Sequence, residues 1–454
     1  MVGINEHVLC RRYVMFRFAI KVILAAIPVS GFCQADLLTL DESLEIALAN
    51  NLAVASARLE VAAAGDEVAA LRTRRYPSLD VVGGVSDNLS DQSYNFEQGV
   101  WGDYPLIGEV PDQDITINSA SGTTSFLSAN LTQPISQQYQ LAMRIEHGEV
   151  KEDMAEEMVR LTQQDLVRIV KQNYFDIVQT RSDLAVTRES ILFYVSLNEL
   201  VSNYVEQQIS LEYELLEVQA RLAHRQLDAS AQQNRLETQR ERMNDLLARD
   251  LNTAFTVQQL PEPGMRPTDP QKAVATALSQ RPDILESQLK VKLAELGYDI
   301  KKADYIPDLE LQFRYARLYN YELIPDTNAY VGLHAKWEFY DWGRKRKELA
   351  SKNSKIIQAT NSARETKNRV IIDVHQSFRA IDQAEGSVRV AKLSQAASRD
   401  KLRVLMNQYE QQSILLQDVL DAETQLGRTD SEYNRAVLSV WKAQAELDRA
   451  IGSN

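Results

Sequence analysis

Apolar residues recur at every second position in four runs of the chain, a spacing typical of β-strands with one apolar face. The runs lie at 79–86, 127–132, 309–315 and 331–339. The clearest two are about 10 residues long, the length of a tilted strand that crosses a bilayer roughly 30 Å thick. Alternation alone fits a half-buried sheet of a soluble protein better than a membrane sheet, so both interpretations stay open at this point.

In longer stretches the apolar positions recur at threes and fours, which predicts helices. Residues 138–205 and 343–408 contain no proline. At 1.5 Å per residue, about 65 residues form a helix on the order of 100 Å long. A short break leads from each into a second predicted helix, at 214–250 and 415–451. The apolar stripes are narrow, so these helices must pack against neighbours.

The same series of elements occurs twice, so the chain is a duplicated unit. A shift of 230 residues lays Ala47–Asn51 on Ala277–Arg281, and a shift of 204 lays Glu214–Glu217 on Asp418–Asp421. Each copy is expected to run helix, strand, strand, long helix, helix. The two repeats are expected at 36–260 and 261–454.

Capping signals and one loop complete the predicted unit. Thr39 opens a capping box, which predicts one helix to about Arg75, and Thr268 opens the equivalent helix of the second copy. The two copies differ mainly in one loop, which is expected at 88–122 in the first copy and at 318–328 in the second. A proline-rich linker over 256–270 joins the copies.

Residues 1–35 have the features of a secretory signal peptide. Arg11 and Lys21 belong to a basic segment, Val22–Val29 is apolar, and Cys33–Ala35 fits a small-x-small cleavage site. The two cysteines of the chain lie in this segment, so the exported chain is expected to have neither disulfides nor a thiolate site.

Charge and motif content exclude several functional classes. The chain has 50 Lys and Arg against 63 Asp and Glu, a net charge of −13, which argues against nucleic acid as a partner. The histidines are isolated and no metal-ligand spacing occurs, so catalytic, cofactor and metal sites are expected to be absent. A secreted hydrolase would need a catalytic constellation that the sequence lacks.

Four strands per chain limit what a membrane sheet could be. The smallest membrane barrels have about eight strands, and an open sheet edge in lipid leaves backbone groups unpaired at several kcal/mol each. If these strands enter a membrane, several chains must therefore share one barrel. Three copies would supply twelve strands and gather the long helices into a tube.

Several motifs, in order and at matching spacing, resemble the outer-membrane factor family, the TolC-like efflux and secretion channels. They are Leu38–Leu44, Leu131–Ile135, Arg281–Asp283, Phe339–Arg344 and Asp418–Ala422. The resemblance covers nearly all of the exported chain. It implies a homotrimer with a 12-strand β-barrel in outer-membrane lipid and an α-helical tunnel in the periplasm.

The resemblance also implies partners and a role. The family works with a periplasmic adaptor (membrane fusion protein) and an inner-membrane pump, as the passive exit duct of a tripartite efflux or type I secretion system. Loops lengthen on the outer side of such barrels, so 88–122 and 318–328 are expected outside and the helix breaks near 208 and 412 in the periplasm. The alternative is a soluble periplasmic coiled-coil scaffold or adaptor protein.

Four carboxylates are candidates for a channel constriction: Asp418, Asp421, Glu214 and Glu217. Asp418 and Asp421 are three residues apart, so they share one helix face. The resemblance places that face near the periplasmic end of the tunnel, where threefold symmetry would form acidic rings that favour cations. The alternative is an ordinary solvated acidic face, and it is stronger for Glu214 and Glu217.

The periplasmic tip is expected at Tyr204, Gln207, Tyr409 and Gln412. The family often has glycine a few residues after a tyrosine there, whereas this chain has glutamines. At the opposite end, the loop 88–122 carries six acidic residues, several aromatic residues and no Lys or Arg. It could cover the outer mouth or bind an external partner, and the alternative is a variable exposed loop. The basic run Arg344–Lys347 is expected at lipid head groups.

Overall fold

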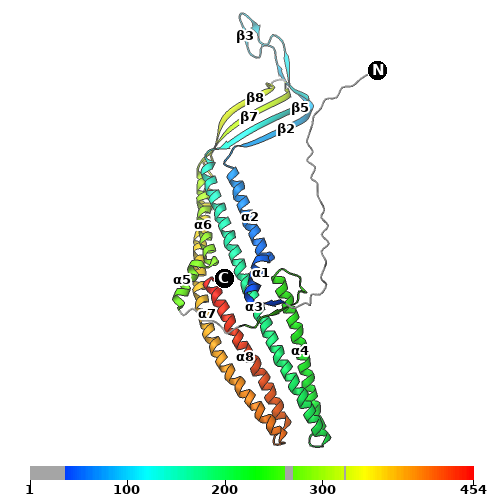
Figure 1. Ribbon diagram of the computed structural model, residues 1–454. Coiled ribbons are helices and arrows are strands. Elements are labelled where there is room, and N and C mark those ends of the chain that lie inside the picture. Colours follow the sequence, from blue (N-terminus) through cyan, green and yellow to red (C-terminus); the bar gives the residue numbers. More distant parts are fainter. Residues whose placement is uncertain (1–35, 261–268, 322–323, 454) are drawn as a thin grey trace, which may run out of the picture.

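The computed structural model describes residues 36–260, 269–321 and 324–453 (Figure 1). The predicted signal segment and Thr268 lie outside the described residues. The molecule is elongated, with a β-sheet near one end and two long helical hairpins that end together at the other (Figure 1). Among the described helices, none is both long enough and apolar enough to cross a membrane.

The four predicted strands form one antiparallel sheet in the order β2-β5-β7-β8. Direct pairs connect Leu79 to Leu131, Leu131 to Phe313, and Phe313 to Val331, so one apolar row crosses the whole sheet. Successive residues of a strand face opposite sides, so polar residues line the other face. The strands are β2 (Ser78–Phe96), β5 (Ile115–Pro134), β7 (Asp308–Tyr321) and β8 (Thr327–Lys336).

The structure confirms the long helices that apolar residues spaced at threes and fours predict. The 70 residues of α3 span about 105 Å at 1.5 Å per residue. α3 packs against α4, α7 packs against α8, and α3 and α8 lie side by side where the two repeats meet. The helices are α3 (Gln137–Glu206), α4 (Glu212–Leu246), α7 (Arg344–Glu410) and α8 (Leu416–Ile451).

The prediction of one continuous helix before each strand pair was wrong. The first copy breaks at Asn51, whose extended backbone ends one helix while its side chain accepts the Ala53 N–H at 2.9 Å and starts the next. The second breaks at the equivalent Arg281, which precedes Pro282 and is therefore held extended. The helices are α1 (Leu40–Asn50), α2 (Leu52–Thr73), α5 (Pro270–Gln280), α6 (Pro282–Lys302) and the 3₁₀ turn Ala303–Tyr305.

The expected capping boxes are partly confirmed. The Thr39 side chain accepts the Glu42 N–H at 3.2 Å, and the Glu42 carboxylate accepts the Thr39 N–H at 3.0 Å. In the second copy the capping side chain is Asp269, which accepts the backbone N–H groups of Gln271 and Lys272.

The start of the predicted linker is structured. Strand β6 (Phe255–Val257) pairs in parallel with β1 (Asp36–Leu38). The buried Tyr174 of α3 donates to the carbonyls of Leu38, at 3.1 Å, and Gln258, at 3.0 Å. This contact ties both ends of the first repeat to the middle of the long helix.

One predicted surface loop also differs from expectation. The loop predicted at 88–122 is shorter than expected, because β2 continues to Phe96 and β5 begins at Ile115. The remaining loop contains a small hairpin of β3 (Asp103–Tyr104) and β4 (Gly108–Glu109). In the basic run, Lys345 is buried, with its Nζ 3.4 Å from the Glu338 carboxylate.

Candidate functional site

The two helical hairpins end in turns of the same geometry. Gln208 and Gln412 have φ angles of 59° and 57°, in the left-handed region that favours glycine. In both turns the next N–H donates to the carbonyl five residues earlier, from Ile209 to Tyr204 and from Ser413 to Gln408. The glutamines therefore stand where a glycine would fit without strain, in both copies.

An aromatic contact joins the two turns. The rings of Tyr204 and Tyr409 lie with their centroids 6.0 Å apart, and the Tyr204 hydroxyl donates to the carbonyl of Glu410 at 3.3 Å. Beneath them lies an apolar cluster from all four long helices, which fixes the two hairpins against each other. Its fully buried members include Leu197, Val201, Val218, Val419 and Leu420.

The tip also holds a perturbed phenol. Burial, together with the nearby charge of Glu214, raises the pKa of Tyr409 to about 12. The Glu214 carboxylate accepts hydrogen bonds from the Ser210 hydroxyl and, at 3.4 Å, from the Leu211 N–H. Glu214 thus caps the first turn of α4, where the helix dipole favours a negative charge.

The four acidic candidates fall into two different environments. Glu217 pairs with Arg221 at 3.6 Å, and Glu214 is bound in the cap, so neither carboxylate is free. Asp418 and Asp421 are exposed in the first turns of α8, while Val419, Leu420 and Ala422 are buried on the opposite face. In the described part of the chain no Lys or Arg forms an ion pair with Asp418 or Asp421, and Asp421 accepts only the Gln417 amide at 2.8 Å.

One buried carboxylate was missed by the sequence analysis. Glu423 of α8 is 4% exposed and accepts hydrogen bonds from the Ser190 hydroxyl and, at 2.5 Å, from the Tyr194 hydroxyl, both on α3. Arg225 of α4 lies 3.8 Å from the same carboxylate. Burial raises the pKa of Tyr194, and the bond to Glu423 raises it further.

The Glu423 cluster therefore connects three helices, α3, α4 and α8, just above the tip. A signal for it was present: Leu416, Val419, Leu420 and Glu423 follow the spacing of a buried helix face, so an acid interrupts the apolar stripe. A buried carboxylate requires hydrogen-bond donors, which identifies the position as a polar contact between helices.

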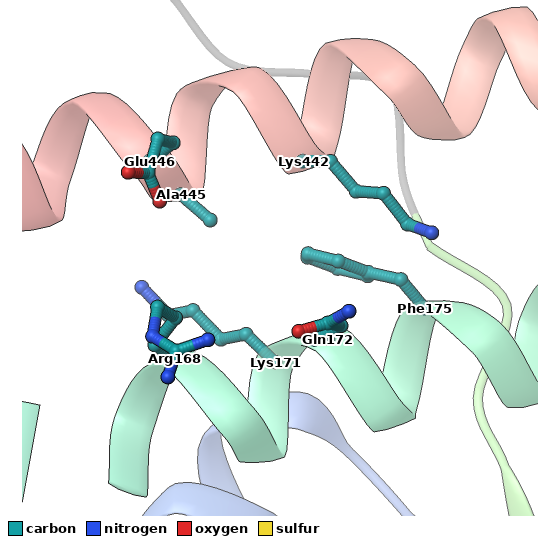
Figure 2. Close-up of a pocket in the computed structure, with 7 residues that line it drawn as sticks. All are labelled: Arg168, Lys171, Gln172, Phe175, Lys442, Ala445 and Glu446. Carbon is teal, nitrogen blue, oxygen red and sulfur yellow. The ribbon is translucent and has the colours of Figure 1, made fainter. Parts of the chain in front are cut away.

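A cavity of about 170 Å³ lies further up, between α3 and α8 (Figure 2). Its cations already face carboxylates, with Lys442 2.7 Å from Asp176 and Lys171 3.8 Å from Asp448. It is therefore part of the seam between the repeats and not an open anion site. The lining residues are Arg168, Lys171, Gln172, Phe175, Lys442, Ala445 and Glu446. Nowhere in the described ranges do three potential ligands group as a metal site.

Comparison with known proteins decides the family. The sequence profile of the family described as outer membrane efflux protein matches residues 43–249 and 273–453. The chain belongs to this outer membrane efflux protein family. The resemblance seen in the motifs is thereby confirmed, and so is the location in the outer membrane. The family is one of efflux proteins and not of enzymes.

Solved structures share the fold at low sequence identity. The channel CusC superposes with a TM-score of 0.76 at 16% identity, over 91% of this chain and 92% of that one. CmeC of Campylobacter jejuni gives 0.76 at 14% identity, over 94% and 90%. VceC of Vibrio cholerae gives 0.73 at 14% identity, over 91% and 96%. No curated protein matches the chain.

Proposed function

We propose that three copies of this chain form the passive exit duct of a tripartite efflux or type I secretion system. The duct would work with a periplasmic adaptor and an inner-membrane pump, which supplies the energy. The observation that carries the proposal is the sheet. Its apolar row is exposed: Leu79 is 67%, Phe313 42% and Val331 68% exposed, and no other part of the described chain covers the row.

The unpaired edges of the sheet call for further copies. Among the described strands, β2 and β8 each pair on one side only, so each leaves a row of backbone groups without partners. In lipid each unpaired group costs several kcal/mol. Four strands cannot curl far enough for the two edge strands of one chain to pair with each other. Pairing β8 of one copy with β2 of the next closes a barrel of twelve strands when three copies take part.

The helices below the edge strands support the same assembly. α2 leads into β2 and α7 follows β8, so these helices lie at opposite margins of the chain. They carry large exposed apolar residues, such as Leu59 at 70% on α2 and Leu393 at 73% on α7. On a single copy these side chains face water, whereas neighbouring copies would cover them.

Asp418 and Asp421 are the proposed constriction. Both are exposed and have no ion-pair partner among the described residues, so threefold symmetry would place six uncompensated carboxylates around one short length of tunnel. Glu214 and Glu217 would add less, because their charges are already engaged. The turns at Tyr204, Gln207, Tyr409 and Gln412 would form the periplasmic end where an adaptor docks.

The alternative of a soluble periplasmic scaffold leaves the apolar row of the sheet facing water. It also conflicts with the membership in an outer membrane protein family. The description of CusC names transmembrane channel formation, and that of CmeC names an outer membrane channel. Both names support a duct for this chain.

Reconstitution and site-specific labelling test the proposal together. The purified protein should conduct ions in planar lipid bilayers, whereas a scaffold would leave the conductance at baseline. The only cysteines of the sequence are Cys10 and Cys33, so Leu106→Cys gives a single thiol beyond residue 35. A membrane-impermeant maleimide should label it on intact cells, and Gln208→Cys only after permeabilisation. The reverse labelling pattern would overturn the topology.

A further inference from the structure

The loop between β2 and β5 is an ordered projection and not a loose connection. Past the last pairing with β7, at Ala120 and Tyr321, the two strands continue as a ribbon to the pair Phe96 and Ile115. Five residues at about 3.3 Å each carry the ribbon about 16 Å beyond the sheet. Figure 1 shows the β3–β4 hairpin at its end, opposite to the helical turns.

The hairpin tip, defined as Glu97–Asp114, is held by its own contacts. Gly102 and Gly108 have φ angles of 109° and 76°, which side chains rarely adopt and which turn the chain sharply. The Trp101 N–H donates to the Val110 carbonyl, and the Val110 N–H donates to the Gly102 carbonyl, both at 2.9 Å. The Gln98 N–H donates to Asp114 at 2.8 Å and closes the base.

This ordered tip exposes apolar side chains. Leu106 is 99% exposed and Ile107 73% exposed, and Trp101 and Tyr104 are each about half exposed. The Tyr104 hydroxyl donates to the Trp101 carbonyl at 2.9 Å, and the Trp101 ring lies 5.1 Å from that of Phe96. Exposed apolar residues close together on a folded hairpin are typical of a contact surface for another molecule.

The charge of the tip selects the kind of partner. Five carboxylates and no Lys, Arg or His occur in the tip: Glu97, Asp103, Glu109, Asp112 and Asp114. All five residues are exposed. Three copies of such a tip would repel one another around a shared axis, and lipid phosphates would be repelled as well. Apolar residues with an acidic rim are complementary to a partner whose apolar residues lie among Lys and Arg.

We propose that the hairpin tip is a docking site, on the outer side of the duct, for a basic polypeptide with an apolar contact face. Leu106 and Ile107 supply the apolar anchors, and the free carboxylates of Glu97, Asp103 and Asp112 attract the basic residues around them. The topology of the proposed duct places the site outside, but binding itself does not depend on conduction.

Binding is measured on the full chain in phosphatidylcholine nanodiscs, by fluorescence anisotropy. The probe is a labelled helical peptide of leucine and lysine, and the control peptide has glutamate in place of lysine. The unchanged protein should bind the lysine peptide and not the glutamate peptide. Leu106→Ser with Ile107→Ser should weaken binding by about tenfold or more, the usual effect of losing a contact anchor.

Two further variants distinguish peptide binding at the tip from binding elsewhere on the chain. Glu97→Gln with Asp103→Asn and Asp112→Asn should also weaken binding, and should reduce its dependence on salt. Leu211→Ser, at an exposed apolar position beside acidic residues of the helical turns, should leave the affinity unchanged. Loss of conductance with peptide binding retained would count against the duct and not against the docking site.

Several results would overturn the docking site. They are no binding of the lysine peptide, equal binding of the glutamate peptide, and an affinity that the tip variants leave unchanged. Spontaneous disulfides between copies of the Leu106→Cys protein would show that the tips contact one another instead, which also contradicts a docking site for a basic partner.

Discussion

The Tyr194 hydroxyl of α3 donates to the buried carboxylate of Glu423 on α8 at 2.5 Å. Tyr194 belongs to the first repeat and Glu423 to the second, and Arg225 of α4 approaches the same carboxylate. If the hairpins moved apart, the buried Glu423 carboxylate would lose hydrogen-bond donors that compensate for its lost hydration. The contact therefore holds the two helical hairpins in one relative position.

Tyr194→Phe should therefore lower the free energy of unfolding of the helical region by about 1–3 kcal/mol, the cost of leaving a buried group short of a partner. Thermal unfolding followed by far-ultraviolet circular dichroism measures the change. Tyr213→Phe is the matched control, because Tyr213 is 60% exposed and should show no effect. Equal loss in both variants would mean that the Glu423 contact adds no stability.

Tyr409 should make the tip sensitive to alkali. Its pKa is about 12 in the folded chain, against about 10 for an unfolded tyrosine. Between these values the unfolded state has lost the proton that the folded state keeps, so stability falls as pH rises above about 10. Melting temperatures taken from about pH 9 to about pH 11 should fall less steeply for Tyr409→Phe. If the melting temperature of Tyr409→Phe falls as steeply with pH as that of the unchanged protein, the raised pKa of Tyr409 is contradicted.

The left-handed turn residues offer a stabilising change. Gln412→Gly should raise the free energy of unfolding by about 0.5–1 kcal/mol, because glycine adopts a φ of 57° without steric cost. Gln411→Gly is the control, since Gln411 has an ordinary φ of −86° and should lose stability instead. Chemical denaturation compares the two. If both variants lose stability, the turn is not strained by the glutamine side chain.

The proposed constriction at Asp418 and Asp421 predicts a change in ion selectivity. Asp418→Ala with Asp421→Ala would remove about six negative charges from the trimer, so the preference for cations in planar bilayers should fall and block by multivalent cations should weaken. The helix should persist, because alanine is the better helix former. Glu217→Ala is the control and should change little, since Arg221 already pairs with that carboxylate. Unchanged selectivity in the double variant would place the constriction elsewhere.

Periodicity and the repeat predicted most of the fold because both are properties of local spacing. The long helices and the four strands follow directly from which positions are apolar. The breaks at Asn51 and Arg281 were missed, although Pro282 gave a signal at the second, because the flanking apolar periods continue across them. The ends of β2 and β5 were misplaced because serine, asparagine and threonine there carry no alternation.

The site was only partly predictable for a different reason. Asp418 and Asp421 stood out because they are close in sequence, and the structure places both on one exposed face. Ser190, Tyr194, Arg225 and Glu423 are brought together from three helices, and sequence distance conceals such a cluster. The folded hairpin at the tip was hidden as well, since it depends on turn geometry and backbone pairing.

Native mass spectrometry of the detergent-extracted protein tests the central claim most directly, that several copies of this four-strand sheet close one membrane duct. Three chains per particle is the expected result, because β8 of each copy then pairs with β2 of the next in a barrel of twelve strands. A particle with a single chain and a folded sheet would contradict the proposed duct.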